Sequence, residues 1–435
     1  MPEPAELEHR TVDLLQRLIR FNTVNPPGQE EEAQLYLCDL LVAAGFECEL
    51  LAAVAGRPNL VARLRGRSDG PGLCYLGHVD TVLADAGDWS VDPWSGELRD
   101  GFVFGRGAID MKGQVAAEIA AVTALAAEGW RPESGELLVI VTADEEAGAE
   151  HGAKWLCEQH PDKVRCDLVV NEGGGDSFAT NGSRFYAVEV AEKGVFRFAL
   201  RTAGRAGHAS IPKIADNALA RLAPIVQTLA ERRPAFDPSP EPEALIEALG
   251  YDPSDPERAL AEIESRDPRV ALLLEPTLGV TFAPTMIHTS EKINVIPARA
   301  ELKVDCRVPP GLGEDHARQR IAELVGQDGY ELEFTEHVIG NRSPSEGPLM
   351  DHIRDFVARE EPDATVVPVM LPGFTDSRWF REAFPSCTAY GFMPRREIGM
   401  FEAAALMHAV DERASVSDLV LGARFFAELA PKVLG

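Results

Sequence analysis

The chain has 435 residues, of which 45% are hydrophobic, and this is long enough for two domains with a large buried core. Its 70 acidic residues outnumber 42 basic ones, which gives a formal net charge of −28 and a pI of about 4.8. Nucleic acids and anionic membrane surfaces bind basic proteins, so the sequence predicts neither as a partner.

The N-terminal residues lack a basic segment followed by an apolar one, so we expect no secretory signal. The longest apolar stretch, residues 115–127, contains Glu118 and is too short to span a bilayer. These features favour a cytoplasmic protein. The seven cysteines form no Cys-x-x-Cys pair, which favours buried core thiols over a disulfide framework or a thiolate zinc site.

The first 186 residues alternate between helix and strand patterns. Apolar residues at helical spacing predict helices over residues 5–20 and 30–44, and an Ala-rich stretch predicts another over 115–128. Apolar or β-rich runs predict strands over residues 47–54, 59–64, 73–76, 137–142 and 167–170. This alternation favours an α/β fold with a mostly parallel sheet flanked by helices.

The next part of the chain has a different pattern. It begins with an expected exposed antiparallel strand over residues 193–203, and the later elements complete a β-α-β-β-α-β order, which is typical of a ferredoxin-like α+β domain. An acidic, Pro-rich insertion over 234–276 is expected on the surface. We therefore predict a lid or dimerisation domain of residues 187–338, inserted into a catalytic domain of residues 1–186 and 339–435.

Five side chains that could bind a metal ion follow strands or lie beside small residues: His78, Asp110, Glu146, Glu172 and His408. Imidazole and carboxylate groups without thiolates suit Zn²⁺, Co²⁺ or Mn²⁺ at a catalytic site that leaves positions open for water. Asp80 follows His78 by two residues and could fix the tautomer of its imidazole.

Each candidate also has an ordinary structural explanation. A histidine at a strand end could simply be hydrogen-bonded, and Asp110 could cap the helix that follows it. Glu145 and Glu146 could form a solvated pair at a helix start, and Glu172 could be a loop acid. The joint arrangement favours the metal site, because independent surface acids would not repeatedly follow buried strands.

Five motifs follow one another in this order: Gly77-His78-Val-Asp80, Trp89-x-x-x-Pro93, Gly105-Arg-Gly-x-x-Asp110-Met-Lys-Gly113, Asp144-Glu145-Glu146 and Asn171-Glu172-Gly-Gly174. The series resembles the dinuclear zinc amidohydrolases and exopeptidases of metallopeptidase family twenty, which includes aminoacylase and carboxypeptidases G and S. The resemblance implies hydrolysis of an amide next to a free carboxylate in an N-acyl-amino acid or small peptide. Acetylornithine deacetylase and succinyl-diaminopimelate desuccinylase, from the same family, represent the alternative activity. A non-catalytic, metal-stabilised binding protein is a further alternative.

By this resemblance Asp110 bridges two divalent metal ions. His78 and Glu172 bind one ion, and Glu146 and His408 bind the other. Zinc is the favoured metal, with cobalt or manganese as alternatives. The resemblance also implies a cis peptide bond between Asp110 and the methionine that follows it.

The resemblance assigns further roles outside the ligand set. Glu145 is the general base, and Asp80, on the second nitrogen of the His78 imidazole, is grouped with it among the catalytic residues. His208 is the lid histidine that reaches an active site, often that of a partner subunit, to stabilise the oxyanion. Asn294 and Arg307 are expected to contact the substrate. His208 could instead be a turn histidine, and Arg307 an ordinary salt-bridge residue.

Two expectations complete the comparison with the family. Arg378 is a candidate substrate contact, with a salt bridge as the alternative. Many family members have His-Gly-Pro-x-Glu at the last ligand, whereas this chain has His408-Ala-Val-Asp-Glu412, so the spacing survives without the Gly-Pro turn. We also expect a homodimer that forms through the inserted domain.

Overall fold

A computed structural model describes residues 2–435, which form two compact units. Unit 1 consists of residues 2–190, Ser343–Pro368 and Thr375–Gly435, and unit 2 consists of Ala191–Arg342 and Val369–Phe374. The division into catalytic and lid or dimerisation domains at residues 187 and 338 stays a prediction. No helix within residues 2–435 is both long enough and apolar enough to cross a membrane.

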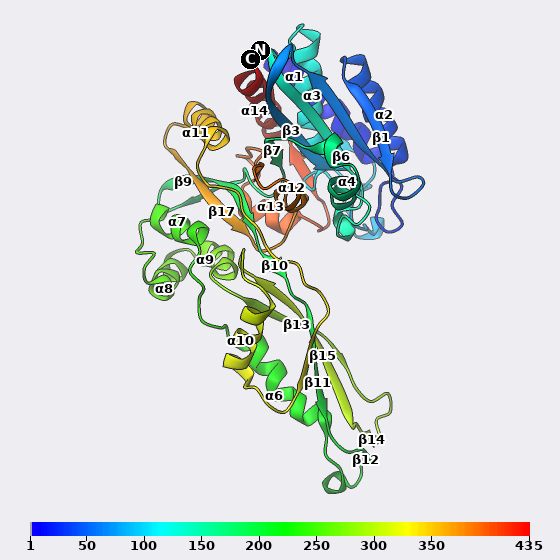
Figure 1. The fold of residues 1–435 in the computed structure, drawn as a ribbon, viewed down its shortest axis with the longest axis vertical. Helices are drawn as coiled ribbons and strands as arrows, with labels where there is room; N and C mark the ends of the chain where they lie inside the picture. Colours follow the sequence, from blue (N-terminus) through cyan, green and yellow to red (C-terminus); the bar gives the residue numbers. More distant parts are fainter. Residues whose placement is uncertain (1) are drawn as a thin grey trace. The chain divides into compact units, whose positions relative to one another are not determined.

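Unit 1 is built on a large mixed sheet (Figure 1). Its strands have the order β1 (Glu47–Ala52), β2 (Pro58–Arg65), β6 (Ser134–Thr142), β3 (Ser68–His78), β7 (Leu168–Asn171), β18 (Thr388–Gly391), β9 (Ser183–Glu192) and β17 (Ala364–Leu371), and β8 (Ser177–Thr180) pairs with β9. The β6–β3, β3–β7 and β7–β18 pairs are parallel, whereas β1–β2, β2–β6, β18–β9 and β8–β9 are antiparallel. The expected parallel sheet therefore forms the centre of a mixed one.

Helices flank this sheet, as expected. They are α1 (Pro4–Arg20), α2 (Glu31–Ala43), α3 (Lys112–Ala127), α4 (Ala153–Gln159), α5 (Pro161–Val164), α11 (Pro348–Glu360), α12 (Ser377–Ala383), α13 (Met400–Leu406) and α14 (Val416–Leu434). A small sheet of β19 (Arg413–Ser415), β5 (Phe102–Phe104) and β4 (Glu97–Arg99) completes the unit, with short 3₁₀ turns η1 (Ala86–Asp88) and η2 (Glu145–Ala147).

Strand β3 shows why a central strand of the sheet has a continuous run of apolar residues in the sequence. Tyr75 points to one face, where its hydroxyl donates to the carbonyl of Phe426 in α14 at 2.6 Å. Cys74 and Leu76 point to the opposite face and pack with buried side chains of α4 and α12. Both faces are covered, so the strand needs apolar residues at every position and delivers His78 at its carboxyl end.

Unit 2 contains the expected ferredoxin-like arrangement. Its strands are β10 (Gly194–Val195), β11 (Phe198–Ala203), β13 (Thr281–His288), β15 (Arg299–Val308) and β16 (Glu331–Phe334), and its flanking helices are α6 (Ala218–Glu231) and α10 (Glu314–Val325). Strands β10 and β11 pair with β15 in one continuous register, so they act as one interrupted strand. The strand order is therefore β13, β15, β10/β11, β16, with every pair antiparallel.

The expected exposure of the strand over residues 193–203 is wrong. Strand β11 lies between β15 and β16, and Phe198 and Leu200 are 1% and 0% exposed because α6 and α10 cover that face. Only the other face of β11 carries the partly exposed Arg201. The alternating pattern thus reports a half-buried central strand.

The insertion over residues 234–276 is largely helical. It contains α7 (Pro240–Ala248), α8 (Pro256–Arg266), α9 (Pro268–Leu274) and the 3₁₀ turn η4 (Glu275–Thr277). Each helix has proline in its first turn, where the missing N–H costs nothing. A separate ribbon of β12 (Gly207–His208) and β14 (Val295–Ile296), with the 3₁₀ turn η3 (Pro212–Ile214), completes unit 2.

Candidate active site

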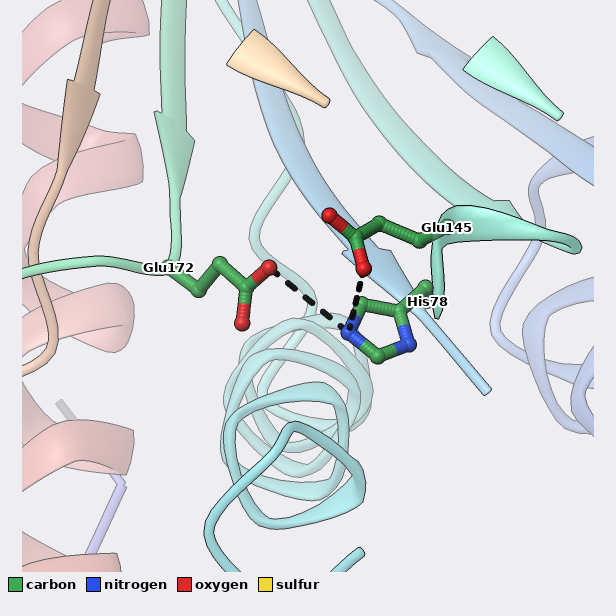
Figure 2. Close-up of side chains that lie close together, drawn as sticks. All are labelled: His78, Glu145 and Glu172. Carbon is green, nitrogen blue, oxygen red and sulfur yellow. Dashed lines mark ion pairs between the residues drawn. The ribbon is translucent and has the colours of Figure 1, made fainter. Parts of the chain in front are cut away.

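Three parallel strands of unit 1 bring metal-capable side chains to one edge of the sheet. His78 ends β3, Glu172 follows β7 directly, and Glu145 lies in the η2 turn that follows β6. Their side chains converge in Figure 2. His78 Nε2 is 3.6 Å from Glu172 Oε1 and 3.9 Å from Glu145 Oε2. This convergence follows from the parallel pairing, because parallel strands end at the same sheet edge.

A second group shares Asp110 with the first. Asp110 Oδ1 lies 3.1 Å from His78 Nε2, and its Oδ2 lies 3.1 Å from His408 Nε2. His408 Nε2 is also 3.2 Å from Glu146 Oε2. One oxygen of the Asp110 carboxylate therefore faces each histidine, which is the arrangement that a bridging carboxylate requires. The peptide bond after Asp110 is cis, as the resemblance implies.

Two sets of side chains offer ligand atoms close enough together to hold a cation. One is His78, Glu145 and Glu172 and the other is Asp110, Glu146 and His408, with ligand atoms within 4.8 Å of one another in each set. Imidazole with carboxylate suits Zn²⁺ and similar ions. Glu146 Oε1 is buried and has no hydrogen-bond partner among the residues that the structure describes. The donor set and this unsatisfied oxygen both fit a divalent metal centre.

Electrostatics at the site also favour cations. Burial, followed by repulsion from Glu172, raises the pKa of Glu145 well above its usual range. Burial and the neighbouring Asp110 raise the pKa of Glu172 to about 7. Burial opposes ionisation of Asp110 as well, but hydrogen bonds with His408 and His78 outweigh it and lower the pKa of Asp110. The two histidines thus compensate Asp110 and leave the other carboxylates short of positive charge.

Asp80 connects the two halves of the site. Its backbone oxygen is 3.0 Å and its Oδ1 3.4 Å from His78 Nδ1. The same carboxylate accepts hydrogen bonds from the backbone N–H groups of Glu145 and Glu146, both at 3.2 Å. Asp80 is fully buried, so it can orient the histidine ring and hold the η2 turn together.

The glycines after Glu172 are required by close backbone packing. A Cβ on Gly174 would lie 2.3 Å from the Gly391 carbonyl oxygen in β18. Gly175 has φ +94°, and a Cβ there would lie 2.0 Å from the Met393 carbonyl oxygen. Side chains would push this loop away from β18, and Glu172 would move with it.

A buried ion pair holds the loops that carry Asp110 and His408. Glu412 is fully buried and accepts hydrogen bonds from Arg106 at 2.6 Å and from the backbone N–H of Asp110 at 3.2 Å. Arg106 also donates to the backbone carbonyl of His408 at 3.2 Å. His408 itself adopts φ +59°, so the loop turns without the Gly-Pro pair. The sequence indicated Glu412, because the chain retains the family's spacing between His408 and this glutamate. It did not indicate the role of Arg106.

Two of the other predicted residues, His208 and Asn294, lie together in unit 2. His208 is exposed, and its Nδ1 is 2.7 Å from the hydroxyl of Ser210. The backbone N–H of Ala209 donates to the carbonyl of Asn294 at 3.0 Å. The β12–β14 pairing therefore brings His208 and Asn294 side by side, and their roles toward a substrate stay predictions.

The two predicted arginines lie in different units. Arg307 is on β15 of unit 2 and donates to Asp305 at 2.7 Å, an ion pair of the kind that the alternative interpretation expects. Arg378 is buried on α12 of unit 1, where its guanidinium lies 4.6 Å from the centre of the Trp379 ring. Their substrate contacts also stay predictions.

The model of peptidase family M20/M25/M40 matches residues 74–432 of the chain. Among curated proteins, succinyl-diaminopimelate desuccinylases of Xanthobacter autotrophicus and Rhodospirillum centenum are 27% and 29% identical, with alignments that cover 93% and 94% of this chain and 94% and 93% of theirs. The desuccinylase of a Wolbachia from Culex pipiens is 33% identical over 51% of this chain, and that alignment spans only 54% of the relative.

Solved structures show the same fold. The M20 family metallo-carboxypeptidase Sso-CP2 from Sulfolobus solfataricus superposes with a TM-score of 0.73 at 17% identity, covering 98% of this chain and 99% of that one. Human carnosine dipeptidase 1 superposes with a TM-score of 0.68 at 16% identity, covering 99% of this chain and 100% of that one. A dinuclear metal-binding M20 peptidase from Bacillus subtilis gives 0.62 at 16% identity, covering 98% of each chain. The chain therefore belongs to peptidase family M20/M25/M40, and it is a hydrolytic enzyme.

Proposed function

We propose that this protein is a two-metal hydrolase that cleaves an amide bond next to a free carboxylate in N-acyl-amino acids or small peptides. The observation that carries the proposal is the Asp110 carboxylate, which presents one oxygen to His78 and the other to His408, each at 3.1 Å. Glu172 and Glu146 complete the two proposed ligand sets. Zinc is the proposed metal, because imidazole and carboxylate ligands without thiolates suit a catalytic zinc site.

Two divalent ions held by these residues would polarise the scissile carbonyl and lower the pKa of a water molecule. Glu145 is the proposed general base, which accepts a proton from that water and returns it to the leaving nitrogen. Two contacts of Glu145 support this role. Its Oε2 lies 3.9 Å from His78 Nε2, and its backbone N–H donates to the Asp80 carboxylate. Asp80 orients the His78 ring and so acts indirectly.

A deacylase that removes a short acyl group from an amino or diamino acid is the second candidate. It is favoured by the curated relatives that align over nearly the whole chain and are named succinyl-diaminopimelate desuccinylases. The chemistry at the amide is the same in both candidates, so the difference lies in the substrate. A panel of N-succinyl and N-acetyl amino acids and of dipeptides, assayed for released amine, separates them.

The general base is tested with Glu145→Gln, which keeps the shape of the side chain and removes its basicity. We expect kcat to fall by about 10²–10⁴-fold while two divalent ions stay bound in metal analysis. Glu150→Gln is the matched control, because Glu150 is an exposed neighbour that pairs only with Lys154 at 2.5 Å among the described residues. Near-normal turnover by the Glu145 variant would remove Glu145 as the base. A wild-type protein that binds metal but hydrolyses nothing in the panel would favour the non-catalytic alternative.

We further propose that His208, Asn294, Arg307 and Arg378 contact the substrate and that the chain forms a homodimer in the cytoplasm. Strand β13, which pairs with β15 alone among the described strands, supports the dimer because it leaves an open sheet edge. Light scattering tests the dimer, and a fully active monomer would contradict it.

A further inference from the structure

A buried amide links two carboxylates beside the η2 turn. The Asn25 side chain donates from Nδ2 to Asp80 Oδ2 at 2.9 Å and to Asp144 Oδ1 at 3.1 Å. The three residues are 7%, 0% and 4% exposed. Two carboxylates that accept from one amide group in a buried site would repel each other without that donor, so Asn25 holds together a pair of like charges.

Arg57 supplies the positive charge for this group. Its guanidinium contacts Asp144 Oδ1 at 3.0 Å and forms two parallel bonds with Glu30, at 2.7 and 3.1 Å. The Glu30 side chain is 0% and the Arg57 side chain 10% exposed. Bidentate geometry of this kind depends on the planar guanidinium fork, which lysine cannot reproduce.

The backbone at Gly28 packs closely against the Arg57 guanidinium. Gly28 has φ +80°, and a Cβ at that position would lie only 2.1 Å from Arg57 Nε. The loop that carries Asn25 therefore packs its backbone directly on the arginine, and this close approach needs glycine.

The network ends on the residues that would carry out the chemistry. Asp144 immediately precedes Glu145, has φ +67°, and accepts the backbone N–H of His151 at 3.0 Å. Asp80 accepts the N–H groups of Glu145 and Glu146. The turn is thus fixed at Asp144 by Arg57 and Asn25, and at its next two residues by Asp80.

We infer that Asn25 and Arg57 are positioning residues, which set the placement of Glu145 and Glu146 through Asp144 and Asp80. Neither acts on the substrate. The inference rests on the proposed function for the roles of Glu145 as base and Glu146 as ligand. The physical reason is that a ligand and a base on a short turn can only be as well placed as the backbone of that turn.

The test compares Asn25→Ala and Arg57→Lys with Arg63→Lys as a matched control. Arg63 lies on β2, a few residues after Arg57, and pairs with Glu136 at 2.5 Å. It is 16% exposed in its side chain, so it is also a largely buried arginine of an ion pair. Three quantities are measured for each variant: Zn²⁺ affinity by chelator competition, kcat and KM, and the melting temperature of the metal-free protein.

We expect Asn25→Ala and Arg57→Lys to weaken the binding of at least one Zn²⁺ ion by roughly 10- to 100-fold. In zinc-saturated enzyme, kcat should fall about tenfold or more while KM changes less than about threefold, because the base is misplaced and the substrate contacts remain. Arg63→Lys should match the wild type in both affinity and kcat. If Asn25→Ala does not fold, Asn25→Ser, which keeps a small donor, is judged by the same criteria.

A purely structural role predicts a different pattern. In that case the variants melt at lower temperature but bind both Zn²⁺ ions and turn over like the wild type per folded molecule, and the inference is overturned. If the wild-type protein hydrolyses nothing in the substrate panel, the proposed function fails, whereas the Zn²⁺ affinities still decide whether Asn25 and Arg57 position the turn.

Discussion

Glu412→Gln tests whether the buried pair with Arg106 holds the loops of Asp110 and His408. One Glu412 carboxylate oxygen accepts the backbone N–H groups of Ile109 at 2.8 Å and Asp110 at 3.2 Å, and the other accepts Arg106 at 2.6 Å. Glutamine has one carbonyl oxygen and one NH₂ group. Whichever way it turns, a donor faces a donor on one side.

The cost can be worked out from these contacts. With its carbonyl toward the two backbone N–H groups, the glutamine turns its NH₂ toward Arg106, whose side chain is only 4% exposed. Breaking a buried ion pair in this way costs about 3–5 kcal/mol, because one charge loses its partner. Arg106 keeps hydrogen bonds to the carbonyls of Leu83 at 3.3 Å and His408 at 3.2 Å. We therefore expect a loss of ~3 kcal/mol in the free energy of unfolding.

Urea unfolding of the metal-free protein measures this loss, and Glu136→Gln provides the matched control. Glu136 pairs with Arg63 and is 22% exposed, so its variant should lose only about 1 kcal/mol or less. A Glu412→Gln variant that unfolds at the same urea concentration as Glu136→Gln would refute the reasoning. Replacing both Arg106 and Glu412 with leucine removes the unpaired charge but also takes away the acceptor of the Ile109 and Asp110 N–H groups, so this double variant should bind Zn²⁺ more weakly than Glu412→Gln.

Three other changes give distinct expectations. The folded-state pKa values of Glu145 and Glu172 are raised, so the metal-free fold binds more protons than the unfolded chain from about pH 4.5 to about 7, and its melting temperature should fall as pH rises through that window. Added Zn²⁺ should remove this slope. Gly391→Ala, whose Cβ would lie 1.9 Å from the Glu172 carbonyl oxygen, should destabilise the fold by about 1–3 kcal/mol in urea unfolding and weaken Zn²⁺ binding in chelator competition. Lys193→Met should expose unit 2 to limited proteolysis, because the buried Lys193 Nζ donates to the carbonyls of Pro276 at 2.8 Å and Gly279 at 2.6 Å, and both would lose their donor.

Several of the proposed site residues could be predicted from the sequence because they follow buried strands. A buried parallel strand leaves a continuous apolar run, and the polar residue that ends it stands out, as His78 and Glu172 do. The pairing of these residues came from family resemblance, since strand order is not visible in a single sequence. The contacts now observed between Asp110 and both histidines are consistent with that pairing.

The supporting network was not predicted, and the reason is its long range. Asn25 contacts residues 55 and 119 positions away, and Arg106 contacts Glu412 across 306 positions. No local periodicity marks such residues, and an arginine or asparagine in a loop is usually solvated. The helices α7–α9 were missed for a different reason. Residues 234–276 were predicted only as an acidic, Pro-rich surface insertion, although proline is favoured in the first turn of a helix, where each of these helices has one.

The charges of unit 1 are distributed in a way that leaves the site ready for cations. Arg106 pairs with Glu412, and Arg57 pairs with both Glu30 and Asp144, which are carboxylates that hold backbone or other side chains in place. In the part of the chain that the structure describes, the ion pairs of Glu145, Glu146 and Glu172 are formed with histidines alone. A lysine or arginine beside those three acids would lower their energy in the metal-free protein and compete directly with a metal ion. The arginines therefore stabilise the frame of the site, while Glu145 and Glu172, whose pKa values are raised, are left without an arginine or lysine partner among the described residues, so that a proton or a divalent ion can neutralise them.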